Sequence, residues 1–236
     1  MLIKNIEEGK LSRVFLILSI ISYSTIFIRA FIQATESGSV GEYRLILLQS
    51  AFGIFIAYLP VILAKRARWL IPTPFYLLFL AFIWCAIFLG EGFGFYYRIP
   101  PWDDILHILS GMMASALGFS LTDLILTEKS SKKPYTPPPL IYALFSLCFA
   151  ISIGVFWEFY EFTFDGILGL NMQKFATPDK SGKMRELVGR EALCDTVTDL
   201  LSDTIGGGII SLAGYLSLIR KKSLTSLFVV KINREK

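Results

Sequence analysis

Residues 140–157 read LIYALFSLCFAISIGVFW, and the acidic segment EFYE follows directly at residues 158–161. The 18-residue stretch contains no charged side chain. An α-helix needs about 20 mostly apolar residues to cross the hydrocarbon core of a bilayer. This stretch therefore predicts a transmembrane helix, and the two glutamates after it place ionisable groups at one of its ends.

The composition of the whole chain agrees with a membrane protein. Of the 236 residues, 54% are hydrophobic and 18% are charged, and the mean hydropathy is +0.59. Such a composition excludes an ordinary soluble enzyme. The formal net charge of +4 and the lack of a basic stripe argue against nucleic-acid binding. Cys85, Cys148 and Cys194 form no CxxC pair and predict no disulfide framework.

Six apolar runs are long enough to span a membrane, and they cover residues 14–31, 45–63, 69–90, 105–126, 140–157 and 200–219. The first run differs from a cleaved signal peptide, because Glu7 and Glu8 precede it and Arg29 interrupts its far end. We therefore expect a retained helix there. The sequence predicts an all-α membrane protein, a six-transmembrane helix bundle in which residues 1–236 form a single integral membrane domain.

The segments between the runs differ in charge. An inside N-terminus with six crossings assigns 15 of the 23 Lys and Arg residues, but only five of the 19 Asp and Glu residues, to the inner side. Because basic loops stay in the cytoplasm, this pattern predicts an N-in/C-in orientation. The inner loop at residues 127–139 is basic and rich in proline. The outer loop at about residues 166–193 is longer and polar, a length typical of a lid or binding element.

Acidic residues gather at the outer ends of the last three predicted helices. They are Asp103 and Asp104 with His107, then Glu158, Glu161 and Asp165, and finally Asp195, Asp199 and Asp203. Residues three, four or seven apart share one face of a helix, so each helix presents a single acidic stripe. Gly111 and the glycines at 206–208 continue two of these stripes and allow close helix approach.

Carboxylates that meet in an apolar environment repel one another, and shared protons, water or bound cations must compensate. Carboxylates with one imidazole form the ligand set expected for Mg, Mn, Zn or non-haem Fe. We therefore expect a divalent metal cation, and the predicted ligands are His107, Glu158, Glu161 and Asp195. Asp103 and Asp199 are the predicted catalytic bases, and Arg190 and Asp203 the predicted substrate contacts.

Structural explanations compete at some of these positions. Asp103 and Asp195 stand in first turns, where a carboxylate complements the helix dipole. A helix cap or packing residue is the alternative for His107. Glu158 and Glu161 lie at a C-terminal helix end, where the same dipole disfavours negative charge, so another interaction must favour them. Arg29 is either a counter-ion or a side chain that snorkels to the headgroups.

The order DxxxH at residues 103–107, EFYE at 158–161 and DTVTD at 195–199, followed by DTIGG, resembles the YjdF-like family of bacterial inner-membrane proteins. More remotely, it is similar to VanZ-like proteins associated with glycopeptide resistance. The resemblance covers Trp102 to about Tyr215 and implies a multi-pass protein of the cytoplasmic membrane. The VanZ-like pattern has Lys, Gln and Asn where this chain has Asp104, Glu161 and Asp203. The resemblance supplies no reaction.

Three functional hypotheses follow from these features. The first is a metal-dependent hydrolase or transferase that acts on an envelope or lipid-linked substrate at the outer leaflet. The second is a non-catalytic accessory protein that binds a lipid or another ligand. The third is a cation- or proton-coupled transporter, although Asp123 is the only carboxylate predicted in the inner half of the spans.

Overall fold

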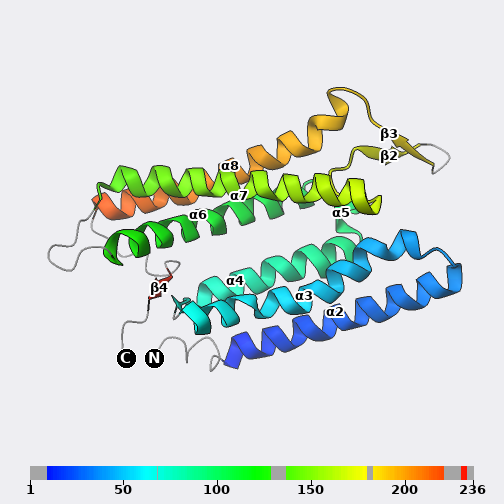
Figure 1. Cartoon of the computed structure of the whole chain (residues 1–236), viewed down its shortest axis with the longest axis horizontal. Helices are drawn as coiled ribbons and strands as arrows, with labels where there is room; N and C mark the ends of the chain where they lie inside the picture. The colour runs from blue at the N-terminus through cyan, green and yellow to red at the C-terminus, as the bar shows by residue number, and fades with distance from the viewer. Residues whose placement is uncertain (1–9, 68, 129–136, 180–182, 221–229, 233–236) are drawn as a thin grey trace.

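The computed structural model describes residues 10–67, 69–128, 137–179, 183–220 and 230–232. The chain is almost entirely helical (Figure 1). The α-helices are α2 (Lys10–Ser37), α3 (Val40–Ala67), α4 (Thr73–Trp84), α5 (Phe95–Arg98), α6 (Trp102–Glu128), α7 (Pro139–Leu168) and α8 (Cys194–Ile219). A π-helix, η1 (Cys85–Gly92), continues α4, and a 3₁₀ turn, η2 (Glu191–Leu193), precedes α8.

Two short antiparallel strand pairs complete the described structure. Strand β1 (Trp69–Leu70) pairs with β4 (Lys231–Ile232). Strand β2 (Ala176–Pro178) pairs with β3 (Met184–Glu186) in the connection between α7 and α8, with Thr177 opposite Arg185. The second pair forms a hairpin beyond one end of the helices (Figure 1).

The prediction of an all-α six-helix membrane bundle is confirmed. Within the described residues, six helical segments are long and apolar enough to cross a membrane: Lys10–Ser37, Tyr43–Arg66, Thr73–Gly92, Trp102–Thr122, Pro139–Leu168 and Glu191–Ile219. Their outward surfaces carry large apolar side chains, including the exposed Phe52, Phe156 and Phe162. Such a surface is suited to contact with lipid tails rather than water.

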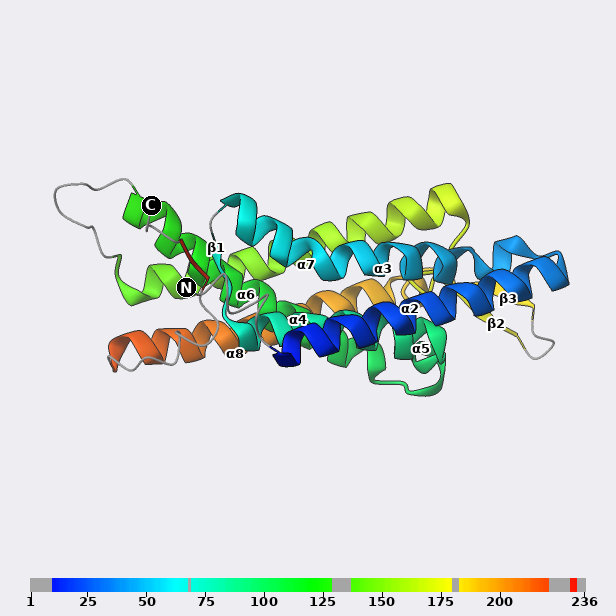
Figure 2. The same ribbon diagram turned by 90° about the horizontal axis from the view of Figure 1, so that it is seen from below.

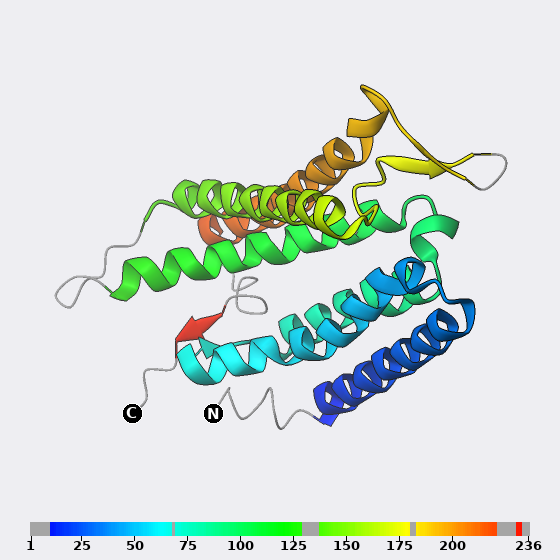
Figure 3. The same ribbon diagram turned by 45° about the vertical axis from the view of Figure 1, so that its right-hand side comes forward.

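The helices run along the length of the molecule (Figure 2) and form two groups of three. Helices α2, α3 and α4 with η1 pack together, and α6, α7 and α8 form the second group. The two groups stay distinct in a turned view, with α5 at one end of the gap between them (Figure 3). In the second group, the start of α6, the end of α7 and the start of α8 lie at the same end of the bundle (Figure 1).

Prolines and a glycine make some helix boundaries differ from the ends of the predicted apolar runs. The third span begins at Thr73, because Pro72 caps it and a second proline occupies its first turn. Trp69 and Leu70 pair with β4 instead. Helix α7 continues to Leu168 and ends at Gly169, which takes a left-handed conformation with φ of 62°. The acids after residue 157 therefore lie within the helix, in its last turns.

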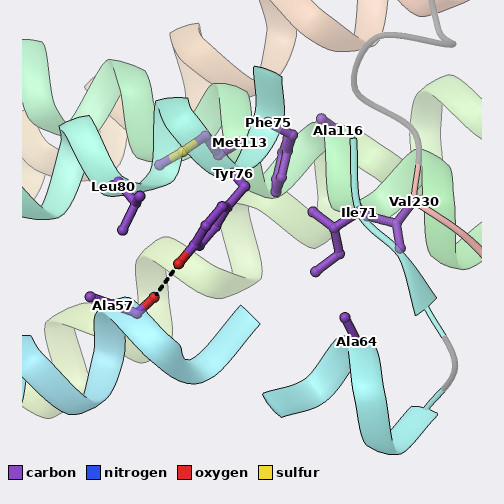
Figure 4. Close-up of a cluster of buried hydrophobic side chains, with 9 residues drawn as sticks. All are labelled: Ala57, Ala64, Ile71, Phe75, Tyr76, Leu80, Met113, Ala116 and Val230. Atoms are coloured by element: carbon purple, nitrogen blue, oxygen red, sulfur yellow. Dashed lines mark hydrogen bonds between the residues drawn. The ribbon is translucent and has the colours of Figure 1, made fainter. Parts of the chain in front are cut away.

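A buried apolar cluster joins the two helix groups (Figure 4). Its members come from α3, α4, α6, the residue after β1 and the chain beyond α8: Ala57, Ala64, Ile71, Phe75, Tyr76, Leu80, Met113, Ala116 and Val230. The Tyr76 hydroxyl donates a hydrogen bond of 3.0 Å to the carbonyl of Ala57, which satisfies the polar atom inside the cluster. The backbone N–H of Val230 donates to the Ser120 hydroxyl at 2.8 Å, so Val230 is held against α6.

Glycines set the spacing between α6 and α8. A Cβ atom on Gly206 would meet the backbone carbonyl of Ile108, and one on Gly111 would meet the backbone carbonyl of Asp203. Of the glycines predicted to permit close approach, Gly111 and Gly206 therefore lie in this interface, whereas Gly207 packs against α7 and a Cβ on Gly208 would meet nothing. On α7, a Cβ on Gly154 would meet the Asp203 carboxylate. This packing brings acidic residues of α8 against both neighbouring helices.

Candidate metal centre

The acidic ends of α6, α7 and α8 converge on two groups of side chains that could hold a metal ion. One group is Asp103, His107 and Asp199, and the other is Glu158, Glu161 and Asp199. Within each group the potential ligand atoms lie within 4.8 Å of one another. Asp199 belongs to both groups and is 2% exposed, so its carboxylate lies at the centre of the arrangement.

His107 is oriented by a carboxylate on α8. Its Nδ1 lies 3.1 Å from Oδ2 of Asp203, and Asp203 also accepts a hydrogen bond from the Ser110 hydroxyl. Because a carboxylate accepts, Nδ1 carries the proton in this pair. The other ring nitrogen, Nε2, points toward Asp199 and Asp103, whose oxygens lie 3.6 and 3.8 Å away.

Glu158 and Glu161 are both buried, at 5% and 7% exposure. Each has one satisfied oxygen: Glu158 accepts from the Gln173 amide at 2.9 Å, and Glu161 accepts from the Trp157 indole at 2.9 Å. The other oxygens, Oε1 of Glu158 and Oε2 of Glu161, are buried and have no hydrogen-bond partner among the residues that the structure describes. Leaving a buried acceptor unsatisfied costs about 1–3 kcal/mol, and more for a charged group.

A short segment of the outer connection covers this end of the bundle. Backbone N–H groups of Met172 and Gln173 donate to the Asp165 carboxylate at 2.8 and 3.0 Å. Lys174 adopts a positive φ of 45°, which is unusual for a residue with a side chain. Its ammonium group contacts Asp103 and lies 2.9 Å from Oδ1 of Asp195. Residues 172–174 thus connect all three acidic helices.

The Lys174 ammonium is held in its charged form by these partners. Burial alone would lower the pKa of Lys174, but the charges of Asp103 and Asp195, and hydrogen bonds to them, outweigh it and raise the pKa above its ordinary value. The lysine therefore supplies one positive charge among the carboxylates at neutral pH. Its stabilising contribution is fully present below the ordinary lysine pKa and is lost as the pH rises through the higher value.

Substitution of Lys174 by Met is expected to destabilise the protein. The side chain keeps its length, but Asp103 and Asp195 lose their cation. Losing one partner of a buried ion pair costs about 3–5 kcal/mol, and the 30% exposure of the Lys174 side chain reduces the expected cost to about 1–3 kcal/mol. Thermal unfolding in detergent measures it. Lys183→Met, at an exposed position of the same outer connection, is the control, and equal melting temperatures for the two variants would contradict the expectation.

The structure places the predicted site residues in different environments. Asp103, His107, Glu158, Glu161 and Asp199 are brought together. Asp203 lies behind His107 as its hydrogen-bond partner. Asp195 lies beside Lys174, outside both groups. Arg190 is exposed, and no ion pair reaches its guanidinium from the part of the chain that the structure describes.

Several residues near the site carry no prediction from the sequence. Glu91, on the π-helix, lies within electrostatic range of Asp103 and Lys174. Tyr96 of α5 is also nearby, and burial together with the charges of Asp103 and Glu91 raises the pKa of its hydroxyl well above the ordinary value. The signal that could have identified Glu91 is an acid flanked by two glycines at the end of an apolar run. Gln173 and Lys174 lie in a loop without periodicity, and no comparable signal marks them.

A separate cavity of about 300 Å³ lies in the first helix group. Its lining includes Arg29 and Gln33 of α2, Tyr43 of α3, Glu91 of η1 and Tyr97 of α5. Among the described residues, no carboxylate forms an ion pair with Arg29. The cavity therefore offers a guanidinium and several hydrogen-bonding groups close to the helix ends that carry the acids.

Comparison with known proteins agrees with the membrane architecture. The family model described as "Predicted membrane protein (DUF2238)" matches residues 15–220, which include all of the acidic residues at this site. An "Uncharacterized protein" of Thermotoga maritima is 29% identical over 158 residues, covering 65% of this chain and 70% of the relative. No solved structure matches the chain.

Proposed function

The chain belongs to the DUF2238 family of membrane proteins, and we propose that it is an integral membrane metalloprotein whose buried carboxylates on α6, α7 and α8 bind a divalent cation. The observation that carries this proposal is the pair of unpartnered oxygens on Glu158 and Glu161. Both belong to a group whose ligand atoms lie within 4.8 Å of one another. A metal ion supplies the partner that these oxygens lack and offsets the repulsion between the carboxylates.

The dimensions of this group suit a small hard cation. Oxygen ligands lie about 2.0–2.2 Å from Mg²⁺ or Zn²⁺. Two ligand atoms at that radius are therefore about 3 Å apart at a right angle and about 4.3 Å apart across the ion, by the geometry of the coordination sphere. The carboxylate ligands favour Mg²⁺ or Mn²⁺ over softer metals.

The proposed location is the bacterial cytoplasmic membrane, with both termini inside and the acidic end in the outer leaflet. The distribution of Lys and Arg along the chain supports this orientation. The first described residue of α2 and the last of α8 lie at the end opposite to the acids (Figure 1), as six crossings require. The resemblance of residues 103–207 to YjdF-like proteins supports the same location, and the remoter VanZ-like resemblance adds no activity.

The chemistry that we propose is metal-assisted hydrolysis or group transfer on a phosphorylated envelope lipid. A bound cation polarises a phosphoryl oxygen and lowers the pKa of bound water. Asp203 holds His107 in position beside the proposed metal site. The cavity around Arg29 supports a lipid substrate, because a guanidinium recognises an anionic headgroup. Arg190, exposed on the outer connection, is proposed to contact the same substrate from the aqueous side.

A lipid-binding protein without turnover is the second candidate, and the cavity around Arg29 is the observation in its favour. In this second hypothesis the protein has the same metal centre, but it binds the lipid without converting it to a product. A transporter would need an acidic path to the inner side, and the side chain of Asp123 lies outside the described residues. Release of inorganic phosphate from a phosphorylated lipid in mixed micelles would separate the enzyme from the binding protein.

Neutralising Glu158 tests the proposed metal site. We expect Glu158→Gln to lower the affinity for Mn²⁺ by about 10–100-fold or more. Loss of a residue that only hydrogen-bonds to a metal ligand already lowers metal affinity by about 10–100-fold. Purified protein is loaded with Mn²⁺, desalted and analysed for metal content. Glu186→Gln, at an exposed position of β3, is the matched control and is expected to bind Mn²⁺ like the unmodified protein. No bound metal in the unmodified protein, or equal binding by the two variants, would overturn the proposal.

A further inference from the structure

Asp199 belongs to both groups of potential ligand atoms, so the site consists of two halves that share this residue. On one side of Asp199 lie Glu158 and Glu161, and on the other lie Asp103 and His107. Oδ2 of Asp199 is 3.6 Å from Nε2 of His107. A carboxylate has two oxygens, so Asp199 is able to serve both halves at once.

The histidine half has the supporting contacts of a metal ligand. His107 is 8% exposed, and its Nδ1–H is engaged by Asp203. Among the described residues Nε2 makes no hydrogen bond, since its nearest carboxylate oxygens, on Asp199 and Asp103, are 3.6 and 3.8 Å away. Once it gives up its proton, Nε2 is free to bind a metal between them. A carboxylate behind a histidine is the usual arrangement for metal-binding imidazoles, since it fixes the tautomer and raises ligand basicity.

The distances in this half match a coordination sphere. Nitrogen and oxygen ligands at about 2.0–2.2 Å from a metal are separated by about 3 to 4.3 Å. The separations of Nε2 from Asp199 and Asp103 fall inside this range. Asp103 keeps its other oxygen for Lys174, so the lysine and a metal would not compete for the same atom.

Charge gives an independent reason for a second cation. Six carboxylates line the site: Asp103, Asp195, Asp199, Asp203, Glu158 and Glu161. Among the described residues, Lys174 is the lysine that forms ion pairs with these carboxylates. His107 and Lys174 supply at most two positive charges and one divalent ion two more, so the six carboxylates can accommodate further positive charge.

We infer that the site binds two divalent metal ions, with Asp199 as the bridging ligand, Glu158 and Glu161 on one ion, and His107 and Asp103 on the other. This inference rests on the proposed metal site and extends it. Paired ions about 3.5–4 Å apart stabilise the attacking and leaving oxygens of an in-line displacement at phosphorus. The substrate class is therefore a phosphate ester or diphosphate, and Arg29 lies in a cavity suited to its lipid portion and charge.

Metal stoichiometry tests the inference separately from the proposed site. Full-length protein in detergent is titrated with Mn²⁺, and bound metal per chain is measured together with the electron paramagnetic resonance spectrum. We expect two Mn²⁺ ions per chain and a spectrum with exchange coupling between them. Asp103→Asn is expected to reduce the content to one ion and remove the coupling, and His107→Gln should do the same.

The outcomes distinguish the two proposals. One ion per chain in the unmodified protein, still lost in Glu158→Gln, would overturn the paired site and leave the single site intact. No bound ion would overturn both. Asp103 is less buried than His107, so Asp103→Asn tests the site even if His107→Gln fails to fold. Two ions retained by Asp103→Asn and by a folded His107→Gln would show that the second ion lies elsewhere and would refute the assignment.

Discussion

Replacing Asp199 by Asn is expected to abolish divalent-metal binding, the largest effect of any single side-chain substitution at this site. Asp199 is buried and belongs to both ligand groups. An amide in its place carries no negative charge and cannot bridge two cations as a carboxylate does. We expect the Mn²⁺ affinity to fall by more than 100-fold, beyond the 10–100-fold effect of a supporting residue. Bound metal per chain after loading and desalting measures the loss.

The same substitution is expected to stabilise the metal-free protein. Removing one of several buried carboxylates relieves repulsion and desolvation, and replacing buried charges with neutral groups is often neutral or stabilising by about 1–4 kcal/mol. Thermal unfolding with and without Mn²⁺ should therefore show a higher melting temperature for metal-free Asp199→Asn and no further rise when metal is added. Asp104→Asn is the control, because Asp104 faces Ser202 at 3.5 Å and lies outside both groups. If Mn²⁺ raised the melting temperature of Asp199→Asn as much as that of Asp104→Asn, the central role of Asp199 in metal binding would be refuted.

Gly206→Ala is expected to cause the second large effect, through the helix interface. The added methyl group would collide with the backbone carbonyl of Ile108, which no side-chain rotation can relieve. Helices α6 and α8 must separate, and overpacking of this kind costs about 1–3 kcal/mol or more. Because His107 and Asp199 lie on these two helices, we expect metal affinity to fall together with thermal stability.

Gly208 provides a matched control on the same helix. A Cβ at Gly208 meets nothing within 4 Å, so Gly208→Ala is expected to stabilise the protein by about 0.5–1 kcal/mol through the better helix propensity of alanine. The two variants should therefore shift the melting temperature in opposite directions. If Gly206→Ala is as stable as Gly208→Ala and binds metal as well, the close packing of α6 on α8 does not position the site.

The spans and acidic stripes could be predicted from the sequence because both depend on local spacing. Apolar runs of membrane length mark the helices, and steps of three or four residues place acids on one face. The sequence could not separate Asp195 from Asp199, which share a face one turn apart. The structure separates them: Asp195 reaches Lys174 from the first turn, and Asp199 lies one turn deeper, where it approaches Glu158 and Glu161.

Contacts from outside the three helices could not be predicted. Lys174 reaches the site through a backbone conformation with positive φ, which the sequence gives no reason to expect at a lysine. Glu91 approaches the site because α4 continues as a π-helix, and its wider turns change which face a residue occupies. Tertiary packing determines where these residues lie, so their position at the site is known only from the folded structure.

The position of Val230 in the buried apolar cluster determines when this cluster can form during synthesis of the chain. Val230 is 2% exposed and packs with Ile71 and Ala116, which precede it by more than a hundred residues. Membrane helices insert as the ribosome delivers them, but this cluster lacks one of its members until Val230 has been synthesised. The contact between the two helix groups is therefore completed only after α8 and the residues that follow it, and shortened chains that end within α8 would lack it.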